Sequence, residues 1–234
     1  MSATGRRAPF AIDFRREVAV AMGWACWKTY LAAAGDEYAR SFAMGVLSTA
    51  LVIGSHAEAA LQLLDTRMEQ MQRLWPQSVL ALDIVAEQAH CLDSLERYDK
   101  ALRCHRAVHN ITSKMYGLND ARTIASGLNL SNSLTRNHDF AQARHLLRRV
   151  LRAAKQTLGE LARNSIQVTR VLARALAFDP DASRANLVEA ERLFADALER
   201  ARRVFGPPDE YTQETAALLA QTRERLAALP PDTV

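Results

Sequence analysis

Aromatic residues, glycine and cysteine are all scarce in this chain of 234 residues. Only 6% of the residues are aromatic, nine are glycine and three are cysteine. β-branched residues never form the alternating runs that a half-buried strand needs, which excludes a sheet protein. The odd number of cysteines, without framework spacing, argues against disulfide bonds and favours a reduced, cytoplasmic location.

Long hydrophobic runs are missing as well. The most apolar stretch, FAMGVLSTALVIG at residues 42–54, falls short of the roughly 20 residues that a membrane-spanning helix needs. It therefore predicts a buried helix, and no membrane contact is expected. No apolar segment follows Arg6 and Arg7 directly, so we expect no secretory signal; Asp13 and Glu17 argue against a transit peptide.

Residues that favour helices dominate the chain instead. Alanine, leucine, arginine and glutamate are the most frequent types, and 49% of all residues are hydrophobic. The 30 basic and 26 acidic residues give a formal net charge of +4 without any block of like charge. This mild excess favours acidic partners slightly and does not require nucleic acid. The composition predicts an all-α protein.

A repeat of 42 residues runs through the sequence. Ala59, Ala101 and Ala143 are separated by 42 residues, and Gly117 and Gly159 keep the same period. Segments 78–117, 118–159 and 160–206 align on this frame, the last with a five-residue insertion at 179–183. A period of this length indicates stacked pairs of helices whose shared core runs from repeat to repeat.

Small residues and glycines recur at fixed places in each copy. The first helix carries a small residue (Ala89, Ser131 and Ala173), and the second begins near Ala101, Ala143 and Ala190. Small side chains let two helices approach closely, so that larger neighbours interlock. The glycines, with Gly206 in the third copy, are expected to end the second helices in the left-handed conformation.

This pattern resembles the tetratricopeptide repeat. The 42-residue length, the aliphatic residue before each glycine and the following threonine or serine resemble its long variety, found in kinesin light chains. The best match covers Thr123 to Gly159, where these residues fall in register: Thr123, Asn129, Leu130, Ser131, Ala141, Ala143, Leu147, Leu158 and Gly159. The resemblance implies a right-handed superhelical stack of antiparallel helix pairs, an α-solenoid.

The predicted organisation follows from the same frame. An N-terminal helix or cap occupies residues 1–35, the repeat array residues 36–229 and a tail residues 230–234. Within the array we expect repeats at about 36–77, 78–119, 120–161 and 162–208, and a capping helix at 209–229. A capping helix keeps the last core face of a solenoid away from water.

The resemblance also implies that the first helices line a concave face that holds a ligand. The candidate peptide-binding residues are His90, Asn129, Asn132, Arg136, Arg170 and Arg174. Arginine offers a rigid fork to carboxylates, and asparagine can satisfy both polar groups of a peptide backbone. The predicted function is a protein-interaction scaffold that binds a peptide, acidic or ending in a free carboxylate; the alternative is that these residues form a solvated helix face.

A second candidate surface is the basic helix at residues 141–155. Its basic residues are Arg144, His145, Arg148, Arg149, Arg152 and Lys155. Spaced three and four apart, the arginines form a stripe able to contact phosphates, which gives the runner-up function, a nucleic-acid-associated regulatory subunit. No aromatic residue for base stacking lies beside them, so a solvated face is the simpler interpretation.

Catalytic motifs are absent from the sequence. There is no phosphate-cradling glycine loop and no G-x-S-x-G, so we expect no enzyme activity and no cofactor. The residues of metal-ligand type that cluster are His90, Cys91, Cys104, His105 and His109. They lack C-x-x-C or H-E-x-x-H spacing, and His105 takes the core-facing position of Leu147 and Phe194. We therefore expect packing rather than a metal; an enzyme with a helical metal site ranks third.

Overall fold

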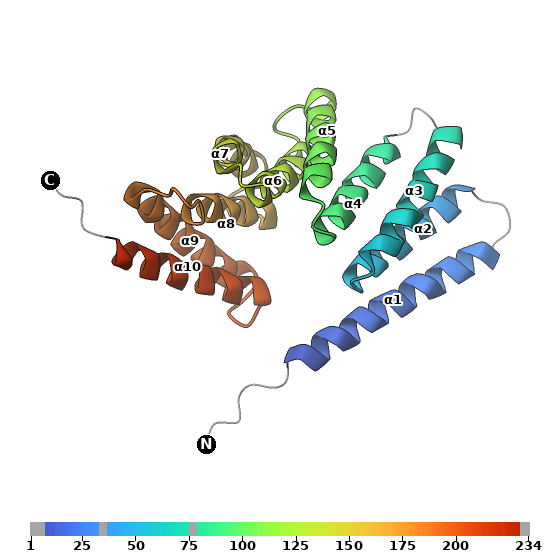
Figure 1. Ribbon diagram of the computed structural model, residues 1–234, viewed down its shortest axis with the longest axis horizontal. Helices are drawn as coiled ribbons and strands as arrows, with labels where there is room; N and C mark the ends of the chain where they lie inside the picture. Colours follow the sequence, from blue (N-terminus) through green and yellow to red (C-terminus); the bar gives the residue numbers. More distant parts are fainter. Residues whose placement is uncertain (1–7, 33–36, 75–78, 230–234) are drawn as a thin grey trace, which may run out of the picture. The chain divides into compact units, whose positions relative to one another are not determined.

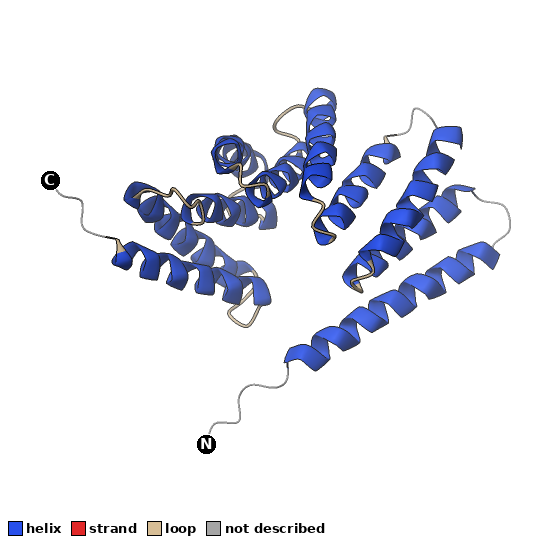
Figure 2. Ribbon diagram, in the orientation of Figure 1, coloured by secondary structure: helices blue, strands red, loops and turns tan. Residues whose placement is uncertain are grey.

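The computed structural model describes residues 8–32, 37–74 and 79–229, with the side chains of residues 8–15 excepted. Within these ranges the chain forms ten α-helices and no strand (Figures 1 and 2). The helices are α1 (Ala8–Ala32), α2 (Glu37–Ile53), α3 (Ala57–Leu74), α4 (Leu80–Ser94), α5 (Tyr98–Tyr116), α6 (Ala121–Arg136), α7 (Phe140–Leu158), α8 (Arg163–Ala177), α9 (Arg184–Val204) and α10 (Glu210–Ala228). The predicted tail at 230–234 lies outside the described residues.

The chain divides into two compact units, residues 1–104 and 105–234, and the division falls inside α5. In the first unit α1 packs on α2, α2 on α3 and α3 on α4, with a further contact between α2 and α4. In the second unit α6 packs on α7 and so on in chain order to α10, while α6 also contacts α8 and α8 contacts α10. Sequential helix pairs with contacts between alternate helices are the arrangement expected of an α-solenoid, so the predicted fold class is confirmed.

The turn inside each of three helix pairs has one shared geometry. Ser55, Glu96 and His138 adopt positive φ angles of 65°, 57° and 60° between α2 and α3, α4 and α5, and α6 and α7. The amide of the next residue then donates to a carbonyl five residues back, for example from Asp139 to Leu134 at 2.9 Å. This is the Schellman end of a helix, which satisfies carbonyls that the last turn leaves free.

The glycines end the second helices as the sequence predicts. Gly117, Gly159 and Gly206 have φ angles of 80°, 85° and 86° and follow α5, α7 and α9. An L-residue with a side chain is strained in this region, whereas glycine adopts it freely. The left-handed glycines therefore set the direction in which the chain enters each following first helix.

The predicted small positions lie in the core, with one error of register. Ala89, Ser131 and Ala173 on the first helices are fully buried, as are Ala101, Ala143 and Ala190 on the second. Ala59, by contrast, is exposed, and its neighbour Ala60 is fully buried as the fourth residue of α3. Because Ala101 and Ala143 are also the fourth residues of their helices, the first copy is one residue shorter than the 42-residue frame assumed.

The core of the first unit includes a buried cation. Leu47, Leu64, Met71 and Ile84 form its apolar part. Against them, Nε of Arg67 donates to the Ser41 hydroxyl at 3.2 Å, and Nη1 of Arg67 lies 3.4 Å from the Glu87 carboxylate. A methyl group at Gly45 would lie 2.7 Å from that Nη1, so the missing side chain at Gly45 provides room for the guanidinium.

The apolar segment at residues 42–54 is a buried helix, as expected. It forms most of α2 and buries Ala43, Met44, Leu47, Ala50 and Leu51. None of the helices in the described ranges is long and apolar enough to cross a membrane.

Candidate peptide-binding face

The candidate binding face lies on the first helices of the second unit, α6 and α8, and continues onto α10. Local sequence fixes where two of these helices begin, because Asp120 accepts from the backbone amide of Arg122 and Asp209 from those of Tyr211 and Thr212. The third residue of each helix, Thr123, Ser165 and Thr212, is buried. We call the exposed side of these helices the first-helix face: Asn129, Asn132, Arg136, Arg170, Arg174, Tyr211 and Glu214.

Arg174 lies at the centre of the first-helix face. Its Nη2 donates to Oδ1 of Asn132 on α6 at 2.8 Å, and the two residues are separated by 42 positions, so they occupy the same place in successive repeats. Burial lowers the pKa of Arg174, and the charges of Arg170 and Arg136 lower it further. Three guanidinium groups are therefore close enough to repel one another.

Arg170 is held by the last helix. Its Nη1 donates to Oε2 of Glu214 at 2.8 Å, and its guanidinium lies 3.9 Å from the centroid of the Tyr211 ring. The Arg170 side chain is only 18% exposed, whereas that of Glu214 is 56% exposed. Burial raises the pKa of Tyr211 to about 12, so this residue remains a neutral phenol. Arg170 is thus positioned by a salt bridge and a cation–π contact.

The structure places the remaining predicted residues as follows. Asn129 and Asn132 are partly exposed on α6, and Arg136 is exposed at the end of that helix. His90 is exposed on α4 and belongs to the first unit. Asn132, Arg136, Arg170 and Arg174 therefore form one group on the second unit, and His90 is described separately from it.

Sequence reasoning missed Tyr211 and Glu214 because α10 was considered only as a cap. The signal was present, since both follow the Asp209 N-cap within two turns of a helix in first-helix position. Beside them lies a cavity of about 300 Å³ lined by Arg163, Gln167, Phe205, Asp209, Glu210, Tyr211 and Glu214. Phe205 and Tyr211 meet edge to face at 5.6 Å, which fixes this end of the face.

The basic helix α7 is divided into paired and unpaired cations. Arg144 bonds to Asp179, Nη2 of Arg148 lies 2.9 Å from Oε2 of Glu189, and Nζ of Lys155 lies 3.4 Å from Oε1 of Glu160. These three charges are balanced within the fold, which weakens the predicted phosphate-binding stripe. In the described part of the chain, Arg149 and Arg152 form no ion pair.

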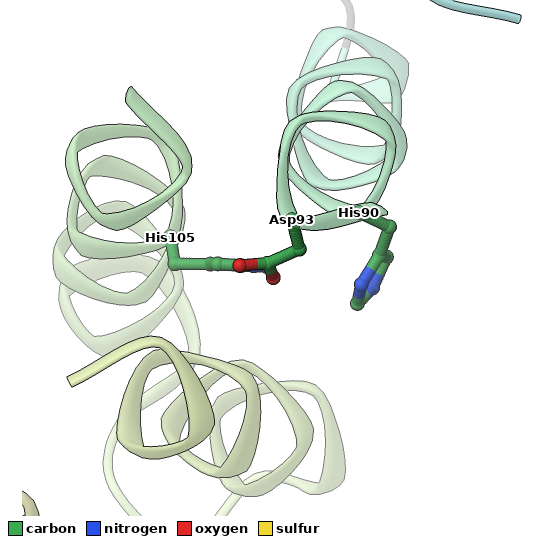
Figure 3. Close-up of side chains that lie close together, drawn as sticks. All are labelled: His90, Asp93 and His105. Atoms are coloured by element: carbon green, nitrogen blue, oxygen red, sulfur yellow. The ribbon is translucent and has the colours of Figure 1, made fainter. Parts of the chain in front are cut away.

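The predicted histidine and cysteine cluster is only partly assembled. Cys91 is fully buried, and burial, followed by the charge of Glu87, raises its pKa to about 11, which suits a packing role. The ligand atoms of His90 and Asp93 on α4 and His105 on α5 lie within 4.8 Å of one another (Figure 3). Asp93 joins this group in place of the two cysteines, and all three residues have other interactions. No metal is assigned here.

Fold and face together define an α-solenoid of helix pairs that presents a polar, arginine-bearing surface. The sequence itself matches the tetratricopeptide repeat at residues 123–166 and 182–210. The predicted resemblance is therefore confirmed: the chain carries tetratricopeptide repeats of the kinesin-light-chain-like kind.

Solved structures agree with this assignment. A putative kinesin light chain from Podosopora anserina with nearly identical TPR-like repeats has a TM-score of 0.62 and 18% identity, over 80% of this chain and 88% of that one. BtubC (BKLC) from P. vanneervenii has a TM-score of 0.61 and 15% identity, over 94% and 95%. A Rap protein complexed with competence and sporulation factor has a TM-score of 0.57 and 15% identity, over 92% of this chain and 61% of that one. At these identities the likeness establishes the fold alone, and no curated protein sequence matches the chain.

Proposed function

We propose that this protein is a non-catalytic interaction module whose first-helix face binds an acidic peptide segment of a partner protein. A tetratricopeptide solenoid is typical of protein-interaction scaffolds. The observation that carries the finer proposal is the group of Arg136, Arg170 and Arg174, which faces a single carboxylate, that of Glu214.

Charge repulsion within this group favours an anionic ligand. Arg174 is partly buried, and in such surroundings charges interact more strongly than in water. The lowered pKa of Arg174 reports the cost of keeping three cations together. A carboxylate bound between Arg136 and Arg174 relieves that cost and gains charge-assisted hydrogen bonds.

The neighbouring side chains suit an extended backbone. Asn132 uses its side-chain oxygen to accept from Arg174, which leaves its amide nitrogen to donate to a peptide carbonyl. Arg170 is held in place by Tyr211 and Glu214 before any ligand arrives, so little side-chain entropy is lost on binding. One protein of similar fold was solved with a bound factor, competence and sporulation factor, which supports ligand binding by this architecture.

The test is a binding titration with defined peptides. Fluorescein-labelled ten-residue peptides rich in Asp and Glu, and matched peptides with Asn and Gln, are titrated with protein while anisotropy is measured. We expect only the acidic peptides to bind, and the combined change Arg136→Gln and Arg174→Gln to weaken binding by about tenfold or more. Arg170 is left intact because its bond to Glu214 joins α8 to α10.

A matched control removes the same charge elsewhere. Arg202 and Arg203 are exposed at the end of α9, and the combined change Arg202→Gln and Arg203→Gln should leave binding nearly unchanged. Equal losses in both double variants would reduce the effect to net charge. Full binding by the Arg136/Arg174 variant would refute the proposed face.

We also place the protein in the cytoplasm. Its cysteines, Cys26, Cys91 and Cys104, are all free, as expected in a reducing compartment. Microscopy of a tagged chain tests this location.

A further inference from the structure

A second cavity lies among α5, α6 and α7, entirely within the second unit. Its volume is about 230 Å³, and its lining residues are His109, Leu118, Asn119, Thr123, Leu146, Arg149, Val150, Arg152, Ala153 and Gln156. Most of these come from the second helices α5 and α7, not from the exposed side of α6 that contributes to the first-helix face. The cavity is smaller than the roughly 300–1,000 Å³ of sites for drug-sized ligands, so it suits one small group.

The cavity combines an apolar interior with a cationic rim. Val150 and Ala153 are buried in its wall, and Leu118 is 52% exposed beside it. Arg149 and Arg152, one helical turn apart on α7, are both exposed. An apolar pocket bordered by two guanidinium groups favours a ligand that joins an apolar group to an anion.

The two arginines are unpaired although carboxylates are available to their neighbours. Arg144, Arg148 and Lys155 of the same helix each reach an acidic partner, whereas Arg149 and Arg152 reach none among the described residues. The pair is also specific to this repeat. In the register of Ala101, Ala143 and Ala190, the equivalent residues are Ala107 and Asn110 on α5, and Asp196 and Glu199 on α9.

His109 closes the inner wall of the cavity without adding charge. Its Nδ1 lies 3.1 Å from the Ser126 hydroxyl, which in turn lies 2.8 Å from the Thr112 hydroxyl. Burial lowers the pKa of His109, and the charge of Arg149 lowers it further, so the imidazole is neutral near pH 7. The positive charge available to a ligand therefore comes from Arg149 and Arg152.

We propose that this cavity receives the C-terminal residue of a partner polypeptide, with its apolar side chain inside and its α-carboxylate bound by Arg149 and Arg152. The arginines line the same small cavity as the apolar groups, so carboxylate and apolar side chain must be joined closely. A C-terminal residue carries both on one Cα atom. An internal acidic residue beside an apolar one does not fit as well, because neighbouring side chains of an extended segment point to opposite sides. Asn119 and Gln156 are available to the preceding peptide group.

The test uses labelled pentapeptides that end in leucine, as a free acid or as an amide. We expect the free acid to bind at least about tenfold more tightly than the amide, and the combined change Arg149→Gln and Arg152→Gln to remove that difference. The imidazole NMR signals of His109 should shift on addition of the free acid. Circular dichroism confirms that each variant is folded.

Two controls separate this site from the first-helix face and from simple charge effects. The Arg136/Arg174 and Arg202/Arg203 double variants should both keep the preference for the free acid. Equal binding of acid and amide, or an undiminished preference after Arg149→Gln and Arg152→Gln, would overturn the inference. It would also be overturned if 4-methylpentanoate bound as tightly as the peptide, because the cavity would then recognise a small acid and not a chain end.

Discussion

Asp179 should be a main electrostatic link between α7 and the turn that leads into α9. This carboxylate belongs to the inserted segment at 179–183, is only 9% exposed, and accepts from Arg144 of α7 and, at 3.0 Å, from the amide of Asp181. Arg144 also reaches the carbonyl of Ala175 at 3.4 Å. Loss of the carboxylate therefore leaves a mostly buried guanidinium with one weak partner.

The expected cost follows from the kind of hydrogen bond that is lost. Bonds to charged groups contribute about 1.5–3 kcal/mol and neutral ones about 1 kcal/mol. Asp179→Ala should lower the free energy of unfolding by about 2 kcal/mol, or about 4–8 °C in melting temperature for a chain of this size. Asp179→Asn keeps the shape and a neutral acceptor, so it should cost about 1 kcal/mol. Asp181→Asn, at an exposed neighbouring carboxylate, is the matched control.

The effect should depend on pH with a defined sign. The hydrogen bond from Arg144 lowers the pKa of Asp179 in the folded protein. The stabilisation is therefore complete above the pKa of about 3.9 in the unfolded chain and disappears as the pH falls through the lower folded value. Urea unfolding followed by circular dichroism should show the full difference between wild type and Asp179→Asn at pH 7 and a smaller one near pH 3. A difference that is independent of pH, or equal to that of Asp181→Asn, would refute the reasoning.

Three further stability predictions concern the backbone and the core, each measured by thermal unfolding. Gly159→Ala should cost about 1 kcal/mol, because φ is 85° and a methyl group there would meet nothing within 4 Å, so only backbone strain changes. Gly45→Ala should cost about 1–3 kcal/mol, because its methyl group would displace the Arg67 guanidinium. Leu147→Ala should cost about 2–5 kcal/mol at a fully buried position, whereas Leu161→Ala, at a side chain 46% exposed, should cost far less. No loss at Gly159, a harmless methyl group at Gly45, or equal effects of the two leucine changes would contradict these expectations.

Much of the fold could be predicted because it depends on residue types with few alternatives. Gly117, Gly159 and Gly206 end helices in a conformation that other residues adopt only with strain. The turns inside the helix pairs use the same conformation at Ser55, Glu96 and His138, three unlike residues that carry no shared signal. For the same reason the one-residue shift from Ala59 to Ala60 was invisible until the turn geometry was known.

The candidate site could be predicted in outline but not in its pairing. The resemblance placed Asn132, Arg170 and Arg174 on first helices, and the structure joins Asn132 to Arg174. Pairing of Arg170 with Glu214 depends on how α8 and α10 pack, which spacing alone does not determine. The division of α7 into paired and unpaired arginines has the same origin, because the partner carboxylates lie between 5 and 41 residues away in sequence.

The most direct test of the central proposal is to locate a bound acidic peptide on the protein. A benzophenone-labelled acidic peptide can be crosslinked by light, and the attachment sites read by mass spectrometry. The proposal predicts crosslinks on the exposed sides of α6, α8 and α10, around Asn132, Arg174 and Tyr211, and their loss after Arg136→Gln and Arg174→Gln. Crosslinks concentrated on α7, on α9 or in the first unit would contradict it.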